Sequence, residues 1–92
     1  MGETLAVGSR IKISANYHFA ENVTGEITQP PAFIIENSDG WKEIVREVKY
    51  SKGILFFYWV KFDEPQIDED GDGPYQEAEI DSEHLILLNS NN

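Results

Sequence analysis

The chain has no cysteine, and its last third has neither lysine nor arginine. Without cysteine there is no disulfide framework, no thiolate zinc site and no cysteine nucleophile, which fits a reducing compartment. No apolar run approaches the ~18 residues that a membrane-spanning helix needs. The opening residues, MGETLAVGSR, lack the basic and apolar regions of a signal peptide. We therefore expect a cytoplasmic protein without membrane insertion.

Charge is unevenly distributed along the chain. Residues 1–61 carry seven acidic and seven basic residues, so this part has no net charge. Residues 62–92 carry ten acidic residues and no basic one, so they account for the whole net charge of −10. A surface of this sign repels nucleic-acid phosphates and anionic lipids. We expect no nucleic-acid binding. The acidic surface at residues 62–83 is expected to face a cation or a protein partner with a basic surface.

The length of 92 residues predicts a single domain over residues 1–92, with a core spanning about residues 5–88. Apolar and polar side chains alternate in Arg10–Ile13, the pattern of a half-buried strand. Residues 23–28 and 84–88 predict further short strands, the latter after a turn at 81–83. The strongest strand is residues 53–65, where both faces are largely apolar. It is either covered on both sides, with segment 36–53 as cover, or it exposes an aromatic patch.

The region before this strand allows more than one interpretation. Residues 33–37 predict a third short strand. Residues 41–50 fit an amphipathic helix, because their apolar residues follow a helical spacing. They fit equally well a hairpin with the following strand, whose loop ends in Gly53. The apolar residues at helical spacing are Trp41, Ile44, Val45 and Val48.

The segments GSRIKI, TGEI, FYWVKFD and EHLILL, taken in order, resemble the layout of small SH3-like barrels. The layout is similar to the ferredoxin-docking subunit of photosystem I, the variable subunit of ferredoxin–thioredoxin reductase and the barrel of the nitrile hydratase β-subunit. The resemblance implies an all-β fold, a small SH3-like partly open barrel with a variable insertion (residues 36–53, helix or hairpin) and an acidic loop. It implies docking or scaffolding, including an accessory subunit of a redox or photosynthetic complex, and no catalytic residue. The matching positions are Gly8, Ile11, Ile13, Gly25, Ile27, Val60, Phe62, Asp63, Leu85 and Leu87.

The acidic loop DEDGDGPYQEAE, residues 68–79, matches the spacing of a calcium-binding loop. Calcium prefers six to eight oxygen ligands, which alternating carboxylates in a tight loop supply. A strand precedes this loop where an EF-hand has a helix, and Tyr75 stands at a position that is usually aliphatic. The alternative is an acidic turn, because Asp and Gly are good turn formers. The candidate metal ligands are Asp68, Asp70, Asp72, Pro74 and Glu79.

Aromatic residues are the second candidate site. They can line a peptide-binding groove together with Phe19, or they can form the core of a small domain. His18 and His84 could meet if the first loop lies beside the last strand, but a metal site needs a third convergent ligand, so we do not expect a metal or catalytic pair. No nucleophile motif occurs. The candidate partner-binding residues are Tyr17, Trp41, Trp59 and Tyr75.

The sequence thus predicts a non-enzymatic docking module for a protein partner, without a cofactor. The alternatives are a calcium-binding module that uses residues 68–79, and an accessory subunit of a redox or photosynthetic complex.

Overall fold

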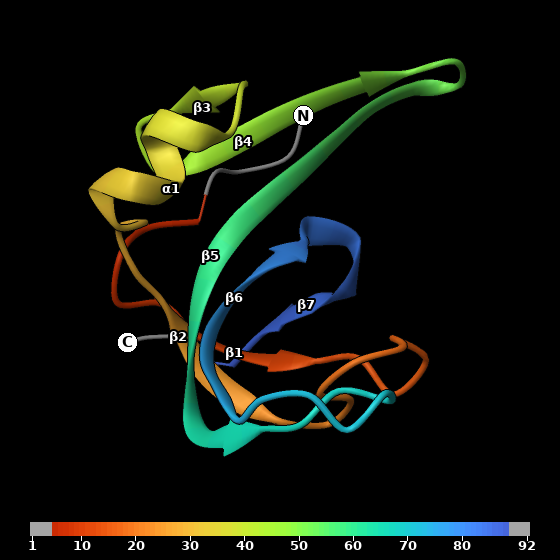
Figure 1. Ribbon diagram of the computed structural model, residues 1–92. Coiled ribbons are helices and arrows are strands. Elements are labelled where there is room, and N and C mark those ends of the chain that lie inside the picture. Colours follow the sequence, from red (N-terminus) through yellow and green to blue (C-terminus); the bar gives the residue numbers. More distant parts are fainter. Residues whose placement is uncertain (1–4, 89–92) are drawn as a thin grey trace.

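The fold is built almost entirely from antiparallel strands. It is described by a computed structural model in which residues 5–88 are placed. The elements, shown in Figure 1, are β1 (Arg10–Ile13), β2 (Thr24–Ile27), α1 (Ala32–Asn37), β3 (Trp41–Lys42), β4 (Val45–Tyr50), β5 (Gly53–Gln66), β6 (Tyr75–Asp81), the 3-10 turn η1 (Ser82–His84) and β7 (Leu85–Leu87).

The strands form one curled sheet in the order β3-β4-β5-β2-β1-β7, and β6 pairs with the free side of β5. The chain leaves β6 through η1 and returns as β7 beside β1, which brings the two ends of the sheet toward each other. No ladder joins β6 to β7 within residues 5–88, so the barrel stays partly open there. This is the small all-β, partly open barrel that the sequence predicted (Figure 1).

The period-two pattern of β1 and β2 explains their place in the barrel. In β1, Ile11 and Ile13 are fully buried, while Arg10 and Lys12 lie on the other face. In β2, Ile27 is buried in the same cluster, and Gly25 lies opposite Phe62 of β5. A Cβ atom at Gly25 would overlap the Lys61 carbonyl oxygen, so a glycine is required for this close approach of the two strands.

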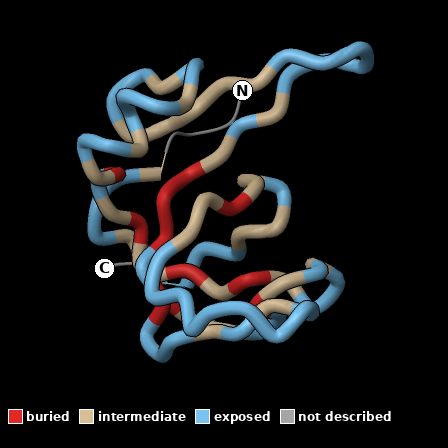
Figure 2. Tube along the Cα trace, viewed as in Figure 1, coloured by how far each residue is buried: buried red, intermediate tan, exposed pale blue. Residues whose placement is uncertain are grey.

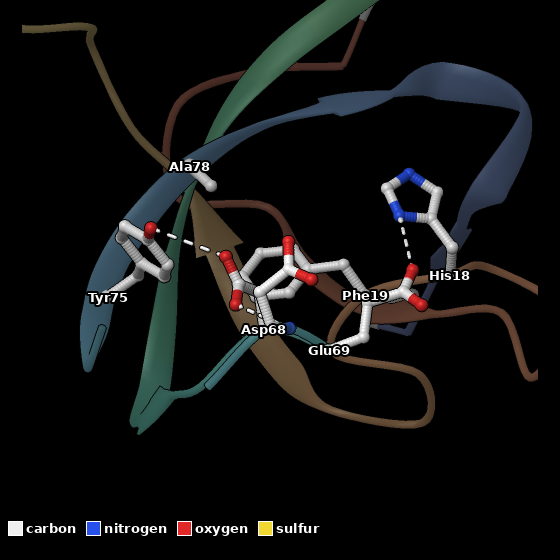
Figure 3. A pocket seen from close by; sticks show the side chains of 7 residues that line it. His18, Phe19, Asp68, Glu69, Tyr75 and Ala78 are labelled. Carbon is white, nitrogen blue, oxygen red and sulfur yellow. Dashed lines mark hydrogen bonds and ion pairs between the residues drawn. The ribbon is translucent and has the colours of Figure 1, made fainter. Parts of the chain in front are cut away.

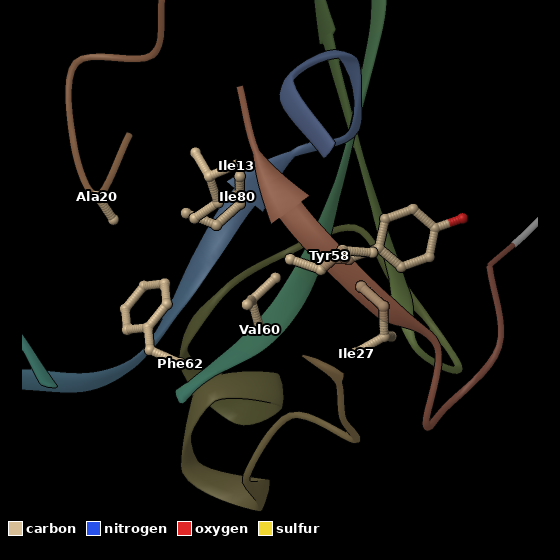
Figure 4. Packing of buried hydrophobic residues seen from close by; sticks show 8 residues of the cluster. Ile13, Ala20, Ile27, Tyr58, Val60, Phe62 and Ile80 are labelled. Carbon is tan, nitrogen blue, oxygen red and sulfur yellow. The ribbon is translucent and has the colours of Figure 1, made fainter. Parts of the chain in front are cut away.

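The buried core forms one cluster that draws on β1, β2, β5, β6 and the loop before β2 (Figure 4). Phe19 and Tyr17 pack against it from that loop, residues 14–23. Trp59 is nearly buried as well but lies outside this cluster, because it projects from the other face of β5. The cluster consists of Ile11, Ile13, Ala20, Ile27, Tyr58, Val60, Phe62 and Ile80.

Strand β5 is shared between the barrel and a projecting hairpin. Over residues 53–56 it pairs with β4 alone, and pairing with β6 begins at Phe57. We call residues 47–56 the arm. It extends away from the barrel (Figure 1), and its surface is exposed or half-buried up to the tip (Figure 2). The exposed large apolar side chains of the arm are Tyr50, Ile54 and Phe56.

The insertion between β2 and β5 corrects two expectations. The strand predicted at residues 33–37 is wrong, since these residues belong to the short helix α1, which starts directly after Pro31. Proline fixes a φ that suits the start of a helix and needs no N–H there. Residues 41–50 form β3 and β4, so the hairpin interpretation is confirmed. β4 extends the sheet beside β5 instead of covering its face.

Candidate functional site: an acidic and aromatic groove

A groove of about 400 Å³ lies between the loop that precedes β2 and the turn that joins β5 to β6. In Figure 3, His18 and Tyr75 lie at opposite ends of the view, and Phe19, Asp68 and Glu69 lie between them. A second hollow adjoins it and adds Tyr17, Glu21 and Ile67 to the shared lining. The groove is lined by His18, Phe19, Asp68, Glu69, Asp70, Tyr75 and Ala78.

Aromatic rings form the apolar part of the groove. Phe19 and Tyr75 meet edge to face, with ring centroids 5.9 Å apart and an interplanar angle of 87°. Phe19 also packs edge to face on the buried Phe62, at 5.7 Å. Such perpendicular contacts are favourable for aromatic pairs. The aromatic wall of the groove is therefore connected to the core through Phe19.

The turn after β5 is organised by the carboxylate of Asp68. Its Oδ1 accepts hydrogen bonds from the backbone N–H groups of Asp70, at 3.0 Å, and Asp72, at 2.9 Å. Its Oδ2 accepts a long hydrogen bond of 3.4 Å from the Tyr75 hydroxyl. An aspartate that bonds its own turn in this way is a common device for stabilising a tight loop. Asp68 is thus engaged with its own turn.

The other carboxylates at the rim are less engaged. Glu69 lies 3.9 Å from His18 Nδ1, and both side chains are highly exposed. The exposed side chain of Asp70 has no hydrogen-bond partner among residues 5–88. These two groups therefore remain available to a ligand.

The predicted calcium ligands come together only in part. Carboxylate oxygens of Asp68, Asp70 and Asp72 lie within 4.8 Å of one another, a spacing that a cation can bridge. Glu79 lies on β6, where its Oε2 accepts a hydrogen bond of 2.8 Å from Arg46 Nη1. Strands β5 and β6 flank the turn in place of helices. The three aspartates offer the oxygen chemistry that calcium prefers.

The pKa values of the two tyrosines beside the groove reflect burial first and nearby negative charge second. Partial burial, the charges of Asp68 and Asp72 and the hydrogen bond to Asp68 raise the pKa of Tyr75. Burial and the nearby charge of Asp81 raise the pKa of Tyr17. Burial, the larger cause, opposes any charge at these positions, whereas the neighbouring carboxylates oppose a phenolate and favour a cation.

The predicted partner-binding residues lie in three different places. Tyr75 forms a wall of the groove and Tyr17 lines the adjoining hollow. Trp59 is 9% exposed, and its indole Nε1–H donates a 2.6 Å hydrogen bond to Glu77. Trp41 is half-buried on β3, which lies at the end of the molecule away from the β5–β6 turn (Figure 1). The structure brings together only Tyr17 and Tyr75 of the four.

Sequence reasoning did not single out His18, Glu69 and Ala78 as groove residues. Ala78 carries no chemical signal, and it lines the groove because β6 places it near Phe19 and Tyr75. The signal for Glu69 was its position between Asp68 and Asp70. His18 and His84 both lie beside the ring of Tyr17, with centroid distances of 4.4 and 4.7 Å.

A second cluster of charge joins strands β1, β2 and β5. Arg10 donates from both Nη atoms to the carboxylate of Asp63, at 2.9 and 2.5 Å, and the Thr24 hydroxyl donates to the same group at 2.5 Å. These hydrogen bonds lower the pKa of Asp63 to about 2, and the one from Arg10 has the larger effect. The cluster stabilises the barrel and presents a neutralised surface, unlike the groove.

Comparison of the chain with protein-family models, with curated proteins and with solved structures gives no match. The fold assignment therefore depends on the strand topology itself. The accessory subunit of a redox or photosynthetic complex stays a prediction. Among residues 5–88, no helix has the length and apolar character to cross a membrane.

Proposed function

We propose that this chain is a non-enzymatic docking module that binds the basic surface of a protein partner through the acidic surface at residues 62–83. The observation that carries the proposal is the groove, which combines aromatic walls with a carboxylate rim. The carboxylates of this rim come from the third of the chain that has ten acidic residues and no lysine or arginine. The absence of cysteine supports a reducing compartment such as the cytoplasm as its place of action.

Two features favour docking over catalysis. The groove carboxylates Glu69 and Asp70 are exposed, whereas acid catalysis uses a carboxyl group whose pKa is raised in an apolar pocket. Asp68, the least exposed of the three, accepts hydrogen bonds from backbone N–H groups of its own turn. Such a surface attracts and orients a charged partner.

A displayed library of random peptides tests the proposal without requiring the partner itself. We expect enrichment of sequences rich in lysine and arginine. Their binding should weaken strongly in about 0.5 M salt, where exposed charges are screened. Enrichment of neutral or acidic peptides, or binding that is indifferent to salt, would contradict the proposal.

A calcium-binding module is the second candidate, favoured by the convergence of Asp68, Asp70 and Asp72. An ion that binds only the folded state at 100 times its Kd stabilises it by about 2.7 kcal/mol. The melting temperature in millimolar calcium should then exceed that in chelator, and Asp70→Asn should abolish the difference. Coinciding melting curves would eliminate this function at physiological affinity.

A further inference from the structure

We infer that the groove between the loop before β2 and the β5–β6 turn holds one lysine or arginine side chain of the partner. Its aliphatic stem lies against Phe19 and Tyr75, and its charged end lies at Glu69 and Asp70. This inference rests on the proposed function and narrows it from an acidic surface to a single specificity site.

The walls of the groove suit the stem of a long cationic side chain. Phe19, Tyr75 and Ala78 contribute aromatic rings and a methyl group, and Tyr75 remains 40% exposed. Lysine and arginine bury their methylene groups on apolar surface while their charged ends stay at the edge. A volume of about 400 Å³ lies within the range of small ligand pockets.

The rim of the groove suits the charged end. Asp68, Glu69 and Asp70 supply three carboxylates, and His18 is the only basic side chain among the described residues that line the groove. Asp68 bonds its own turn, so Glu69 and Asp70 are the groups that face a ligand. The rings of Phe19 and Tyr75 add the attraction of an aromatic face for a cation.

Aromatic walls and carboxylates together favour a side chain over a bare ion. A hydrated metal ion makes no favourable contact with the apolar wall, and an apolar side chain makes no ion pair with the carboxylates of the rim. Only a ligand with a methylene stem and a positive end uses both halves of the groove.

The basic tip of the arm from a second copy is a competing occupant, since it carries Lys49 and Lys52 beside Tyr50. Calcium at the three aspartates is another. Both are distinguished from a partner's side chain in the experiment below.

The experiment is a titration of the whole chain, followed by two-dimensional amide NMR, with three peptides. Each has the same glycine- and serine-rich frame and differs at one central residue. Lysine has stem and charge, norleucine has the stem alone, and 2,3-diaminopropionic acid has the charge on a short stem. We expect the lysine peptide to shift the amides of Phe19, Glu69, Asp70 and Tyr75. It should bind about tenfold tighter than either analogue, a ratio equivalent to 1.4 kcal/mol.

Two matched sets of variants locate the site. Glu69→Gln with Asp70→Asn should weaken the lysine peptide about tenfold. Glu64→Gln with Glu83→Gln makes the same charge change on the acidic surface outside the groove and should cost about twofold, as expected for a screened exposed charge. Tyr75→Ala should weaken binding, and Tyr50→Ala, which truncates an exposed tyrosine on the arm, should not.

The outcomes separate the inference from the proposed function. Two results would overturn the groove site and leave a diffuse acidic docking surface. One is equal affinity for the lysine and diaminopropionic acid peptides, and the other is an equal loss of affinity in the two double variants that each remove two negative charges. If none of the cationic peptides shifted amides of residues 62–83, both would fall.

The competing occupants have signatures of their own. Displacement of the lysine peptide by millimolar calcium would overturn the inference in favour of a metal site. A molecular mass that rises with concentration, and returns to that of the monomer in Lys49→Glu with Lys52→Glu, would assign the groove to a second copy. A monomer at all concentrations together with calcium-insensitive peptide binding supports the inference.

Discussion

The two halves of β5 have similar sequences and very different surroundings. Ile54 and Phe56 in the arm are 46% and 40% exposed, whereas Val60 and Phe62 in the barrel are 0% and 5% exposed. All four lie on the same face of one strand. The difference comes from the number of neighbours, since Val60 lies between Ile27 of β2 and Ala78 of β6, whereas Ile54 pairs within residues 5–88 with Lys49 of β4 alone.

This comparison shows what alternation can and cannot determine. A period of two assigns residues to the faces of a strand, but burial requires a second layer or a closed sheet around that face. The barrel provides this closure for residues 58–62. The arm has only its hairpin partner, so its apolar residues stay at the surface.

Truncation of the two phenylalanines gives the largest contrast. Phe62→Ala should lower the free energy of unfolding by about 3–5 kcal/mol, because it opens a cavity in the core. Phe56→Ala should cost less than about 1 kcal/mol, since Phe56 is exposed at the surface and lies outside the core cluster. Urea unfolding followed by tryptophan fluorescence measures both. Similar costs would mean that the arm is packed in solution.

Loss of Arg46 should have the next largest effect, because this side chain ties β4 to the barrel strand β6. Its Nη1 donates to Glu79 of β6 at 2.8 Å and its Nε donates to the Asp39 carbonyl at 2.7 Å. Arg46→Met should destabilise the fold by about 2 kcal/mol, the range for hydrogen bonds to charged groups. Amide hydrogen exchange in β4 should accelerate more than in β1.

Lys42→Met is the control for this tie. Lys42 pairs with Glu47 at 3.2 Å, but its side chain is 68% exposed. Exposed ion pairs contribute about 0–1 kcal/mol. A loss equal to that of Arg46→Met would show that net charge, and not the tie to β6, holds β4 in place.

Acid should weaken the barrel through Asp63 in a defined window. The pKa of Asp63 is lowered to about 2 in the folded protein, so its stabilising contribution is complete above the unfolded value of about 4. The contribution is lost as the pH falls from about 4 through about 2. In Asp63→Asn, the fall in melting temperature over this window should be shallower, while Asp39→Asn should leave it unchanged. An identical pH profile for Asp63→Asn would contradict this assignment.

A polar residue on the arm should have the smallest effect. Ile54→Thr retains a β-branched side chain at an exposed position and should change the free energy of unfolding by less than about 0.5 kcal/mol. The same unfolding measurement tests it. A large loss would indicate that a second layer covers this face in solution.

Local patterns predicted much of the barrel. The alternation in Arg10–Ile13, the apolar run of β5 and the turn before β7 are each contained in a few neighbouring residues. Helix α1 was missed because Phe33, Ile34 and Ile35 favour strand by composition, whereas Pro31 starts a helical turn. The choice between helix and hairpin at residues 41–50 depended on β5, whose edge is free to pair with β4.

In the candidate site, too, contacts between residues close in the sequence were predictable, and contacts made by the fold were not. Asp68, Asp70 and Asp72 are close in the sequence, so their convergence was predictable from the loop pattern. Glu79 was misleading, because the ladder of β6 places it within reach of Arg46. The contact of Phe19 with Tyr75 joins the first loop to the start of β6, which are far apart in the sequence, and only the curled sheet brings them together.

The tip of the arm also has a practical consequence. Ser51 and Lys52 form an exposed two-residue turn, remote in the view of Figure 1 from both the core and the groove. Insertions are tolerated best at such loop tips. A fluorophore or an immobilisation tag attached there would leave the groove unobstructed, so the tip is a suitable attachment point for testing the proposed docking on a sensor surface.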